Sequence, residues 1–390
     1  MALRTQLPFY GLYIGQFAFL GVQLPFLSGW LAQAGFSVGD VGLITGAALV
    51  VRIISGPLVG VLADQTFSQK QILQFVALLM LASALGVAFF TVPVLLAIAC
   101  TLMLVAFGIL LPVADIALTR AERAGLSNFG FVRASGSAAF IVMNIIAGFL
   151  IDGVGYKVAV LTMCMAALAA LLSTQALPSL EPAARRRQRF SLSFIQKLIS
   201  NHAFIVFLIA VSAIQASHAF YYAFSILHWR SIGISASVIG ILWSTGVVVE
   251  VLVLTRTKKL HSLFTPEILI GIGGAAAFIR WSLTSFEPSI AGLFVIQTLH
   301  SLTFASTYLG TIQFLRQAVP DEMSNTAMTM TSTLSVGAAT GVATILAGLL
   351  YTKSGAPSAY LFMGFLGLLG VLFSLILKRL WRGGLLPIAP

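Results

Sequence analysis

The sequence carries very little charge. Of its 390 residues, 22 are Lys or Arg and 11 are Asp or Glu, so 8% are charged and 59% are hydrophobic. Soluble domains have roughly 25% charged residues, about three times as much. A chain of this size with so few charges cannot cover a surface exposed to water. The composition excludes a soluble enzyme, a secreted disulfide scaffold and a disordered chain, and it favours a protein surrounded mainly by lipid.

Cysteine and catalytic motifs are also scarce. Cys100 and Cys164 lie in apolar stretches, and without the spacing of a disulfide or metal motif they are expected to be packing residues. The sequence has no phosphate-binding loop, nucleophile elbow or Cys/His cluster. We therefore expect no enzymatic activity, no metal, no cofactor and no ATP-driven pumping by this chain alone.

Long apolar segments are the main feature of the sequence. About 20 mostly apolar residues are needed for a helix to span a bilayer, and strands are excluded because the segments lack alternating polarity. The first segment has the length of a span and no small-residue cleavage site, so it is expected to remain as the first helix. The twelve predicted spans are 7–29, 38–63, 71–91, 93–119, 129–151, 157–177, 203–228, 235–255, 266–285, 288–316, 326–351 and 358–380.

The positions of Lys and Arg predict the orientation. With both termini in the cytoplasm, sixteen of the 22 cations face the cytoplasm and three face the other side (Lys157, Arg230 and Lys353). The other three lie within spans (Arg52, Arg133 and Arg280). This bias is typical of a multi-pass protein of an inner, bacterial-type cell membrane with cytoplasmic termini.

A polar segment divides the spans into six and six. It predicts an N-terminal bundle (1–177), a basic cytoplasmic linker (178–202) and a C-terminal bundle (203–390). The cations at 185–189 are expected to contact anionic lipid headgroups. The net charge of +11 is thus explained by topology, and we expect membrane lipid and a small-molecule substrate as partners, no nucleic acid, and a monomer.

The two halves also resemble each other. At a constant offset of 198, five residues of 35–52 recur in 233–250: Gly35, Ser37, Gly42, Val50 and Val51 match Gly233, Ser235, Gly240, Val248 and Val249. Two parallel halves related by an axis along the membrane normal are the layout of major facilitator transporters. The expected fold is an all-α membrane protein with twelve transmembrane helices in two pseudo-symmetric six-helix bundles.

Local motifs resemble this superfamily. Gly60 and Asp64 match the gating motif Gly-x-x-x-Asp-Arg-x-Gly-Arg-Lys of the loop after the second helix, although Gln65 and Phe67 depart from it. The segments 111–115 (LPVAD) and 132–137 (VRASGS) resemble signatures of the phenylpropionate permease branch, and Val247–Val251 resembles its eighth helix. This branch is distantly similar to lactose permease and nucleoside symporters. The resemblance implies proton-coupled import of a small organic solute, without a cofactor and with the proton as coupling ion.

Ionisable residues inside spans are candidate functional residues, because each costs roughly 2.5–3.5 kcal/mol on insertion scales. The predicted substrate-binding or coupling residues are Arg52, Asp115, Arg133, Glu250 and His300. Arg52 and Glu250 occupy equivalent repeat positions and could form a contact between halves, or Arg52 could bind helix-end carbonyls or Asp64. His218 is interpreted as a hydrogen-bonded packing residue. Aromatic residues of the first and seventh spans could line a pocket for an aromatic ring or could face lipid; they are Tyr10, Tyr13, Phe17, Tyr221 and Tyr222.

One short loop separates Asp115 and Arg133, which places them on antiparallel neighbouring helices. They could form a structural ion pair, or Arg133 could bind a substrate carboxylate while Asp115 holds it in place. Glu250 is the predicted proton-coupling carboxylate, or its side chain could extend to the cytoplasmic edge of the membrane.

The predicted function is import of an aromatic or other carboxylic acid by a symporter with alternating access. A drug or metabolite antiporter and a nucleoside or sugar symporter are the alternatives. The absence of proline from 129–151 counts against export, since exporters of the superfamily commonly carry a Gly-Pro motif there.

Overall fold

The computed structural model describes residues 3–65, 68–178 and 192–387, except for the side chains of 3–5, 55–65, 192, 258, 259 and 325. Every regular element within these residues is a helix, and two elements are π-helical turns. The elements are α1 (Leu3–Gln33), α2 (Val38–Gln65), α3 (Gln69–Phe89), α4 (Pro93–Arg123), α5 (Phe129–Val154), α6 (Lys157–Ala176), α7 (Leu192–Ile199), α8 (His202–Ala216), α9 (Ala219–Ser231), α10 (Ala236–Leu254), α11 (Thr257–Leu263), α12 (Pro266–Thr284), α13 (Ile290–Thr298), η1 (Leu302–Ser306), α14 (Thr307–Ala318), α15 (Asp321–Ser332), η2 (Thr333–Ala339) and α16 (Thr340–Leu380).

The helices are consistent with the twelve predicted spans. Ten helical segments in the described part of the chain are long and apolar enough to cross a membrane. One of the ten runs from Asp321 to Leu380, and Gly355 interrupts it with a φ of 79° between the two spans predicted there. The ten do not include α2, which covers the span predicted at 38–63.

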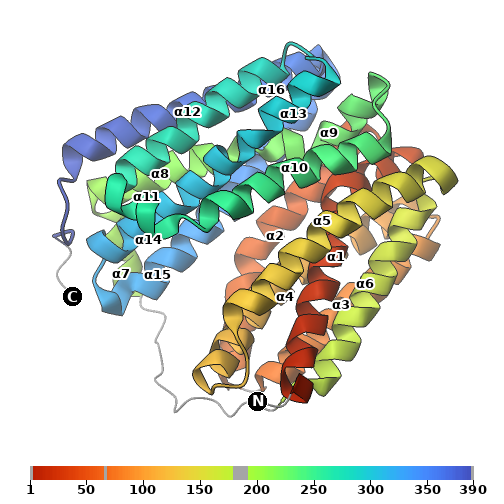
Figure 1. Cartoon of the computed structure of the whole chain (residues 1–390), viewed down its shortest axis with the longest axis horizontal. Coiled ribbons are helices and arrows are strands. Elements are labelled where there is room, and N and C mark those ends of the chain that lie inside the picture. Colours follow the sequence, from red (N-terminus) through yellow and green to blue (C-terminus); the bar gives the residue numbers. More distant parts are fainter. Residues whose placement is uncertain (1–2, 66–67, 179–191, 388–390) are drawn as a thin grey trace. The chain divides into compact units, whose positions relative to one another are not determined.

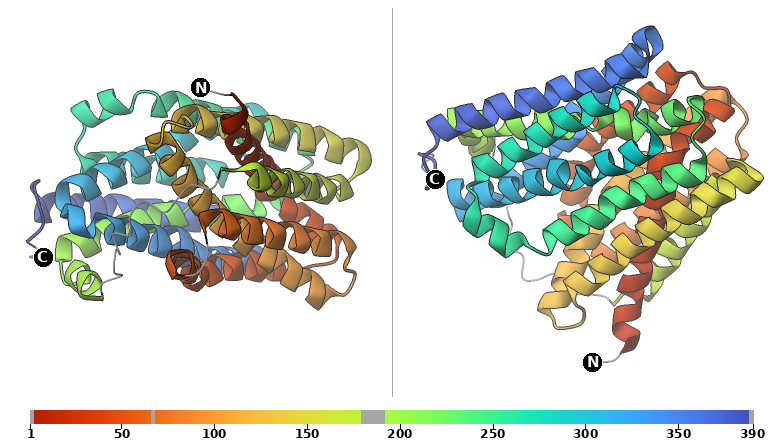
Figure 2. Two further views of the ribbon diagram at one scale, coloured as in Figure 1. Left: turned by 90° about the horizontal axis from the view of Figure 1, so that it is seen from below. Right: turned by 45° about the horizontal axis from the view of Figure 1, so that its top comes forward.

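The chain forms two compact units. Unit 1 comprises Met1–Arg186 and Tyr222–Ser244, and unit 2 comprises Arg187–Tyr221 and Thr245–Pro390. Within unit 1, α1 packs against α5 and α6, and α4 packs against α2 and α3 (Figure 1). Within unit 2, α12 lies along the C-terminal part of α16 in both further views, and α8 also packs against α16 (Figure 2).

Helix ends follow from local sequence. Ser68 and Gln71 form a capping box at the start of α3, which satisfies two backbone N–H groups that the helix leaves open. Pro93 is at the first position of α4, where its missing N–H costs nothing. Gly155 ends α5 with a φ of 85°. The predicted division between the spans at 71–91 and 93–119 is confirmed by the boundaries of α3 and α4.

The π-helical turn η2 lies in the predicted span at 326–351, and two further predicted spans contain breaks that the hydrophobic pattern does not reveal. The span at 203–228 is divided into α8 and α9 at Ser217 and His218, and the Phe220 N–H points to the sulfur of Met363 at 3.4 Å. The span at 288–316 contains the π-helical turn η1, where the Thr303 hydroxyl bonds to the carbonyl of His300 at 3.0 Å. Such turns are frequent at functional sites, and both breaks lie beside a buried histidine.

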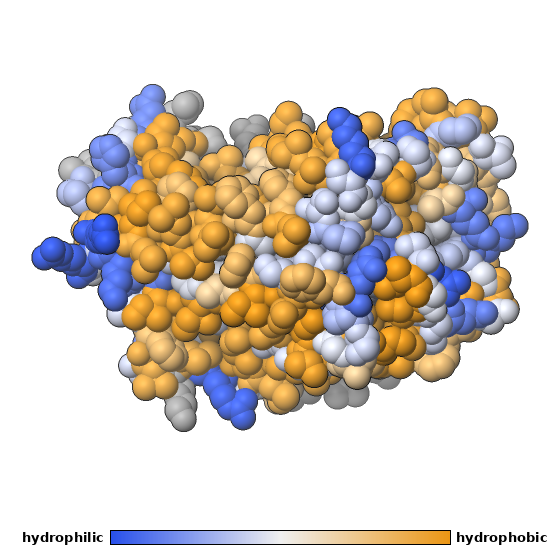
Figure 3. Space-filling model, turned by 90° about the horizontal axis from the view of Figure 1, so that it is seen from above, coloured by the Kyte–Doolittle hydropathy of each residue, from blue (hydrophilic) through white to orange (hydrophobic). Residues whose placement is uncertain are grey.

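Apolar side chains cover much of the exterior. Phe89, Phe131, Val154 and Phe286 are among the large hydrophobic residues with more than two thirds of their surface exposed. Figure 3 shows a face on which apolar side chains predominate and hydrophilic residues occur in patches. This surface is suited to contact with lipid tails.

Part of the predicted linker is helical. Within 178–202, α7 spans Leu192–Ile199, and Leu198 is fully buried in a hydrophobic cluster that includes Phe204, Phe314 and Leu377. The basic run at 185–189 lies outside the described residues.

Candidate functional site

The first ionic cluster lies in unit 1 and joins α1, α4 and α5. Asp115 on α4 and Arg133 on α5 come together with 3.7 Å between Oδ1 and Nη1. Tyr13 on α1 donates its phenol O–H to Asp115 Oδ1 at 2.5 Å. The predicted proximity of Asp115 and Arg133 is confirmed, because the short loop between α4 and α5 holds the two helices antiparallel. Tyr13 was expected only as one of the aromatic residues that could line a pocket, and its contact with Asp115, 102 residues away in sequence, was not predicted.

Aromatic packing fixes the guanidinium of Arg133. Its central carbon lies 4.6 Å from the ring centroid of Phe17, a cation–π distance. Gly136, one turn further along α5, lets the Phe17 ring approach its backbone, since a Cβ at this position would meet Phe17 at 2.8 Å. Arg133 and Asp115 keep 39% and 37% of their side-chain surface exposed, so a solute can reach both.

Arg52 binds a helix carbonyl. Its Nη2 donates to the carbonyl of Gly108 on α4 at 3.2 Å, and the arginine stem occupies the space that a Cβ of Gly108 would take. Gly108 lies in the middle of α4, so this contact differs from the helix-end carbonyls expected in one interpretation of Arg52. Gly60 and Asp64 of the gating motif lie in 55–65, whose side chains are outside the description.

The second ionic cluster lies in unit 2. Glu250 on α10 and His300, between α13 and η1, approach to 3.3 Å between Oε2 and Nε2. Their side chains are 16% and 10% exposed. Two of the predicted residues, 50 positions apart in sequence, are therefore neighbours in a protected environment. Gly246, one turn before Glu250, provides room for this approach, because its Cβ would lie 3.2 Å from His300.

Arg280 on α12 completes this cluster and was not among the predicted site residues. It is fully buried. Nη2 donates to Gln297 Oε1 at 2.6 Å, and Nη1 contacts His300 Nδ1 at 3.0 Å. Because a guanidinium can only donate, His300 Nδ1 must accept and the neutral imidazole carries its proton on Nε2, facing Glu250. The sequence did contain one indication of a role for Arg280, because it is one of the three cations assigned to the interior of the predicted spans.

His218 links the break between α8 and α9 to the same cluster. It is fully buried, with Nε2 2.9 Å from the hydroxyl of Thr303 in η1. Nδ1 is 3.0 Å from the carbonyl of Ile214. Arg280 also lies 4.2 Å from the Trp281 ring and 4.8 Å from the Tyr221 ring. The histidine is buried and hydrogen-bonded within a polar network, which agrees with its interpretation as a hydrogen-bonded packing residue.

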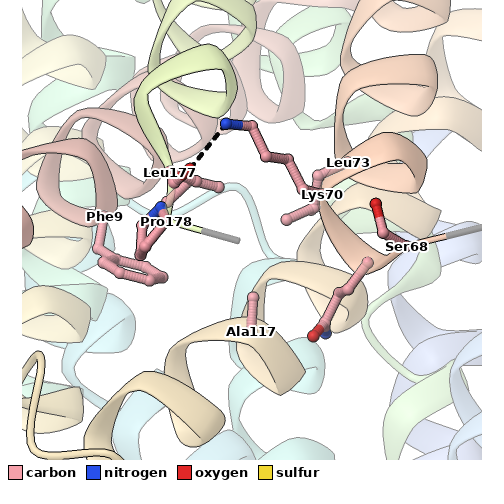
Figure 4. A pocket seen from close by; sticks show the side chains of 8 residues that line it. Phe9, Ser68, Lys70, Leu73, Ala117, Leu177 and Pro178 are labelled. Atoms are coloured by element: carbon pink, nitrogen blue, oxygen red, sulfur yellow. Dashed lines mark hydrogen bonds between the residues drawn. The ribbon is translucent and has the colours of Figure 1, made fainter. Parts of the chain in front are cut away.

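Unit 1 has a small pocket in which Lys70 has a structural role. It is lined by Lys70, Phe9 and Leu73 among others (Figure 4). The Lys70 ammonium donates to the carbonyls of Gln175 and Leu177 at 2.8 Å each. Lys70 thus satisfies carbonyls at the end of α6, a role that suits a cation at a helix C-terminus.

The described residues contain no group of three or more His, Cys, Asp or Glu side chains that could hold a metal ion. Cys100 and Cys164 are both buried free thiols. The side chains of the two clusters can form ion pairs, hydrogen bonds and proton-transfer contacts.

Comparison with known proteins identifies the family. The model of the MFS_1-like family matches residues 7–362. A probable 3-phenylpropionic acid transporter of Escherichia coli (strain K12) is 29% identical over 88% of this chain and 90% of its own. A maltose permease of Geobacillus stearothermophilus is 24% identical over 97% and 95%.

Solved structures show the same fold. The nucleoside transporter NupG matches with a TM-score of 0.78 and 18% identity, over 98% of this chain and 100% of its own. A bacterial homologue of the lysosomal transporter Spinster matches with a TM-score of 0.72 and 13% identity, over 96% and 95%. With its membrane-spanning helices and two ionic clusters, the chain belongs to the MFS_1-like family and is a multi-pass membrane transporter of the major facilitator kind, not an enzyme.

Proposed function

We propose that this transporter imports an aromatic carboxylic acid together with a proton. The observation that carries the proposal is Arg133, a guanidinium inside a span that is 39% exposed and lies 3.7 Å from Asp115. The planar fork of arginine matches a carboxylate better than any other side chain. The similarity to a probable 3-phenylpropionic acid transporter supports an aromatic acid as the substrate class.

In the proposed cycle, one cluster binds the substrate and the other carries the proton. The substrate carboxylate binds Arg133, and the ring of Phe17, 4.6 Å from the guanidinium, supplies an apolar wall. Glu250 carries the coupling proton, and His300 at 3.3 Å fixes the orientation of its carboxyl group. Alternating access then exposes both clusters to one side of an inner, bacterial-type membrane at a time, with the termini in the cytoplasm.

The experiment is uptake of 3-phenylpropionate into proteoliposomes with and without an imposed pH gradient. We expect accumulation above the external concentration only with the gradient. Arg133→Lys retains the charge but loses the bidentate geometry, so it should raise the KM for the acid by roughly tenfold or more. Equal losses for the acid and for 3-phenylpropionamide would make Arg133 a structural residue.

A neutral solute is the second candidate. The maltose permease that matches 97% of this chain favours a sugar, and the ion pair of Asp115 and Arg133 could bind sugar hydroxyls as donor and acceptor. Maltose uptake in the same proteoliposomes, unaffected by excess 3-phenylpropionate, would support this candidate over the acid.

A further inference from the structure

Tyr13 controls the hydrogen bonding of Asp115. Its side chain is fully buried and its ring lies 6.2 Å from that of Phe17 with an interplanar angle of 11°, so its position is fixed. The phenol donates to Asp115 Oδ1 at 2.5 Å. A hydrogen bond from a phenol to an ionised carboxylate is charge-assisted and stronger than one between neutral groups.

Arg133 approaches the same oxygen without bonding to it. Its Nη1 is 3.7 Å from Asp115 Oδ1, beyond hydrogen-bond range, and Nη1 is buried without a hydrogen-bond partner. Asp115 therefore supplies a compensating negative charge while Arg133 retains an unused donor. Asp115 thus leaves the guanidinium without a direct hydrogen bond, and 39% of the Arg133 side chain is exposed to an approaching solute.

We propose that Tyr13 is a positioning residue that determines specificity for carboxylates, by keeping Asp115 bonded to its phenol and so leaving the donors of Arg133 for the substrate. The inference rests on the proposed function of Arg133. Without the phenol, the nearest strong donor to Asp115 is Arg133. A short internal ion pair would then form, and the substrate carboxylate would have to compete with Asp115 for the guanidinium.

The test is equilibrium binding of 3-phenylpropionate and 3-phenylpropionamide to the purified full-length protein. Tyr13→Phe should raise the Kd of the acid roughly tenfold, the value of a charge-assisted hydrogen bond, and should leave the Kd of the amide unchanged. Tyr10→Phe removes a phenol three residues earlier on α1 and should change neither Kd. An unchanged Kd of the acid in Tyr13→Phe would overturn the inference.

A second substitution distinguishes positioning from packing. In Tyr13→Phe/Asp115→Asn the competing carboxylate is gone, so the Kd of the acid should return to the wild-type value or below it. If Tyr13 only fills space, the double variant will bind the acid as weakly as Tyr13→Phe does. If Tyr13→Phe does not fold, Asp115→Asn alone still decides: retained or tighter acid binding supports the inference, and weaker binding overturns it.

The outcome also separates this inference from the proposed function. If Arg133→Lys weakens acid binding while Tyr13→Phe does not, the carboxylate site stands and the role of Tyr13 fails. If neither substitution affects acid binding, the proposed site itself is wrong.

Discussion

At the scale of single residues, the Arg280 guanidinium contacts three polar side chains of unit 2. Gln297, His300 and Thr303 all lie within hydrogen-bond reach of its guanidinium. Such a network is stabilising only as a whole, because removing one member leaves the others unsatisfied. Arg280 therefore determines both the tautomer of His300 and the stability of the site around it.

Replacement of Arg280 by methionine should destabilise the protein. The apolar side chain leaves Gln297 Oε1 and His300 Nδ1 without their donor, and each unsatisfied buried group costs about 1–3 kcal/mol. We expect a clearly lower midpoint of thermal unfolding in detergent. The control is Arg256→Met, because Arg256 lies exposed in the turn between α10 and α11, and its described side-chain contact is to the carbonyl of Leu252 in α10. Equal midpoints for the two variants would contradict the network.

At the scale of helices, α5 and the start of α10 form a close crossing within unit 1. A Cβ on Gly148 would meet the carbonyl of Ala236 at 2.5 Å, and a Cβ on Gly240 would collide with the carbonyl of Asn144. The Asp152 carboxylate accepts from the backbone N–H groups of Ala236 and Ser237 at 2.9 and 2.8 Å. A residue of α5 therefore caps α10.

The internal repeat allows the cap of α10 to be compared with the cap of α2, the equivalent helix in the first half. In the first half, Asp40 caps its own helix, accepting from the N–H of Ser37 at 2.9 Å. The equivalent position in the second half, 198 residues later, is Val238. The carboxylate there comes instead from Asp152, which also pairs with Arg230 at 3.4 Å. The cap thus joins two helices, where the cap at Asp40 stabilises one.

Asp152→Ala should weaken the crossing by about 1–2 kcal/mol, the usual value of a lost helix cap. Because the cap joins α5 to α10, we expect faster hydrogen exchange at the first turn of α10 and at the end of α5. Asp40→Ala, the matched control, should affect only the first turn of α2. Unchanged exchange at α5 in Asp152→Ala would show that the cap does not hold the two helices together.

At the scale of the whole molecule, hydrophobic runs predicted the spans well because each must satisfy its backbone within lipid. The breaks at His218 and η1 could not be predicted from hydrophobic runs. The first involves Met363, which is distant in sequence, and the second involves a local hydrogen bond of the Thr303 hydroxyl. Asp115 and Arg133 were predictable from a short loop. The contacts of Tyr13 and Arg280 were not, because they depend on tertiary packing.

Proton coupling is a property of the whole transport cycle, and Glu250→Gln tests it. Glutamine mimics the protonated carboxyl group and cannot titrate, so the loaded carrier can still reorient but the empty one cannot release and regain a proton. We expect loss of uphill accumulation of 3-phenylpropionate driven by a pH gradient, with exchange of internal for external substrate retained. Both are measured with radiolabelled substrate in proteoliposomes.

Glu267→Gln is the control, because Glu267 is a buried carboxylate of the same unit at the start of α12, bonded to the hydroxyl of Thr265. It should retain both activities. Retained accumulation in Glu250→Gln would place the coupling proton elsewhere, with Asp115 and His300 as the next residues to test. Loss of exchange as well, in a folded variant, would mean that Glu250 acts in substrate binding or in gate closure. The pattern of the two assays, more than the size of either loss, therefore decides which step of the cycle Glu250 serves.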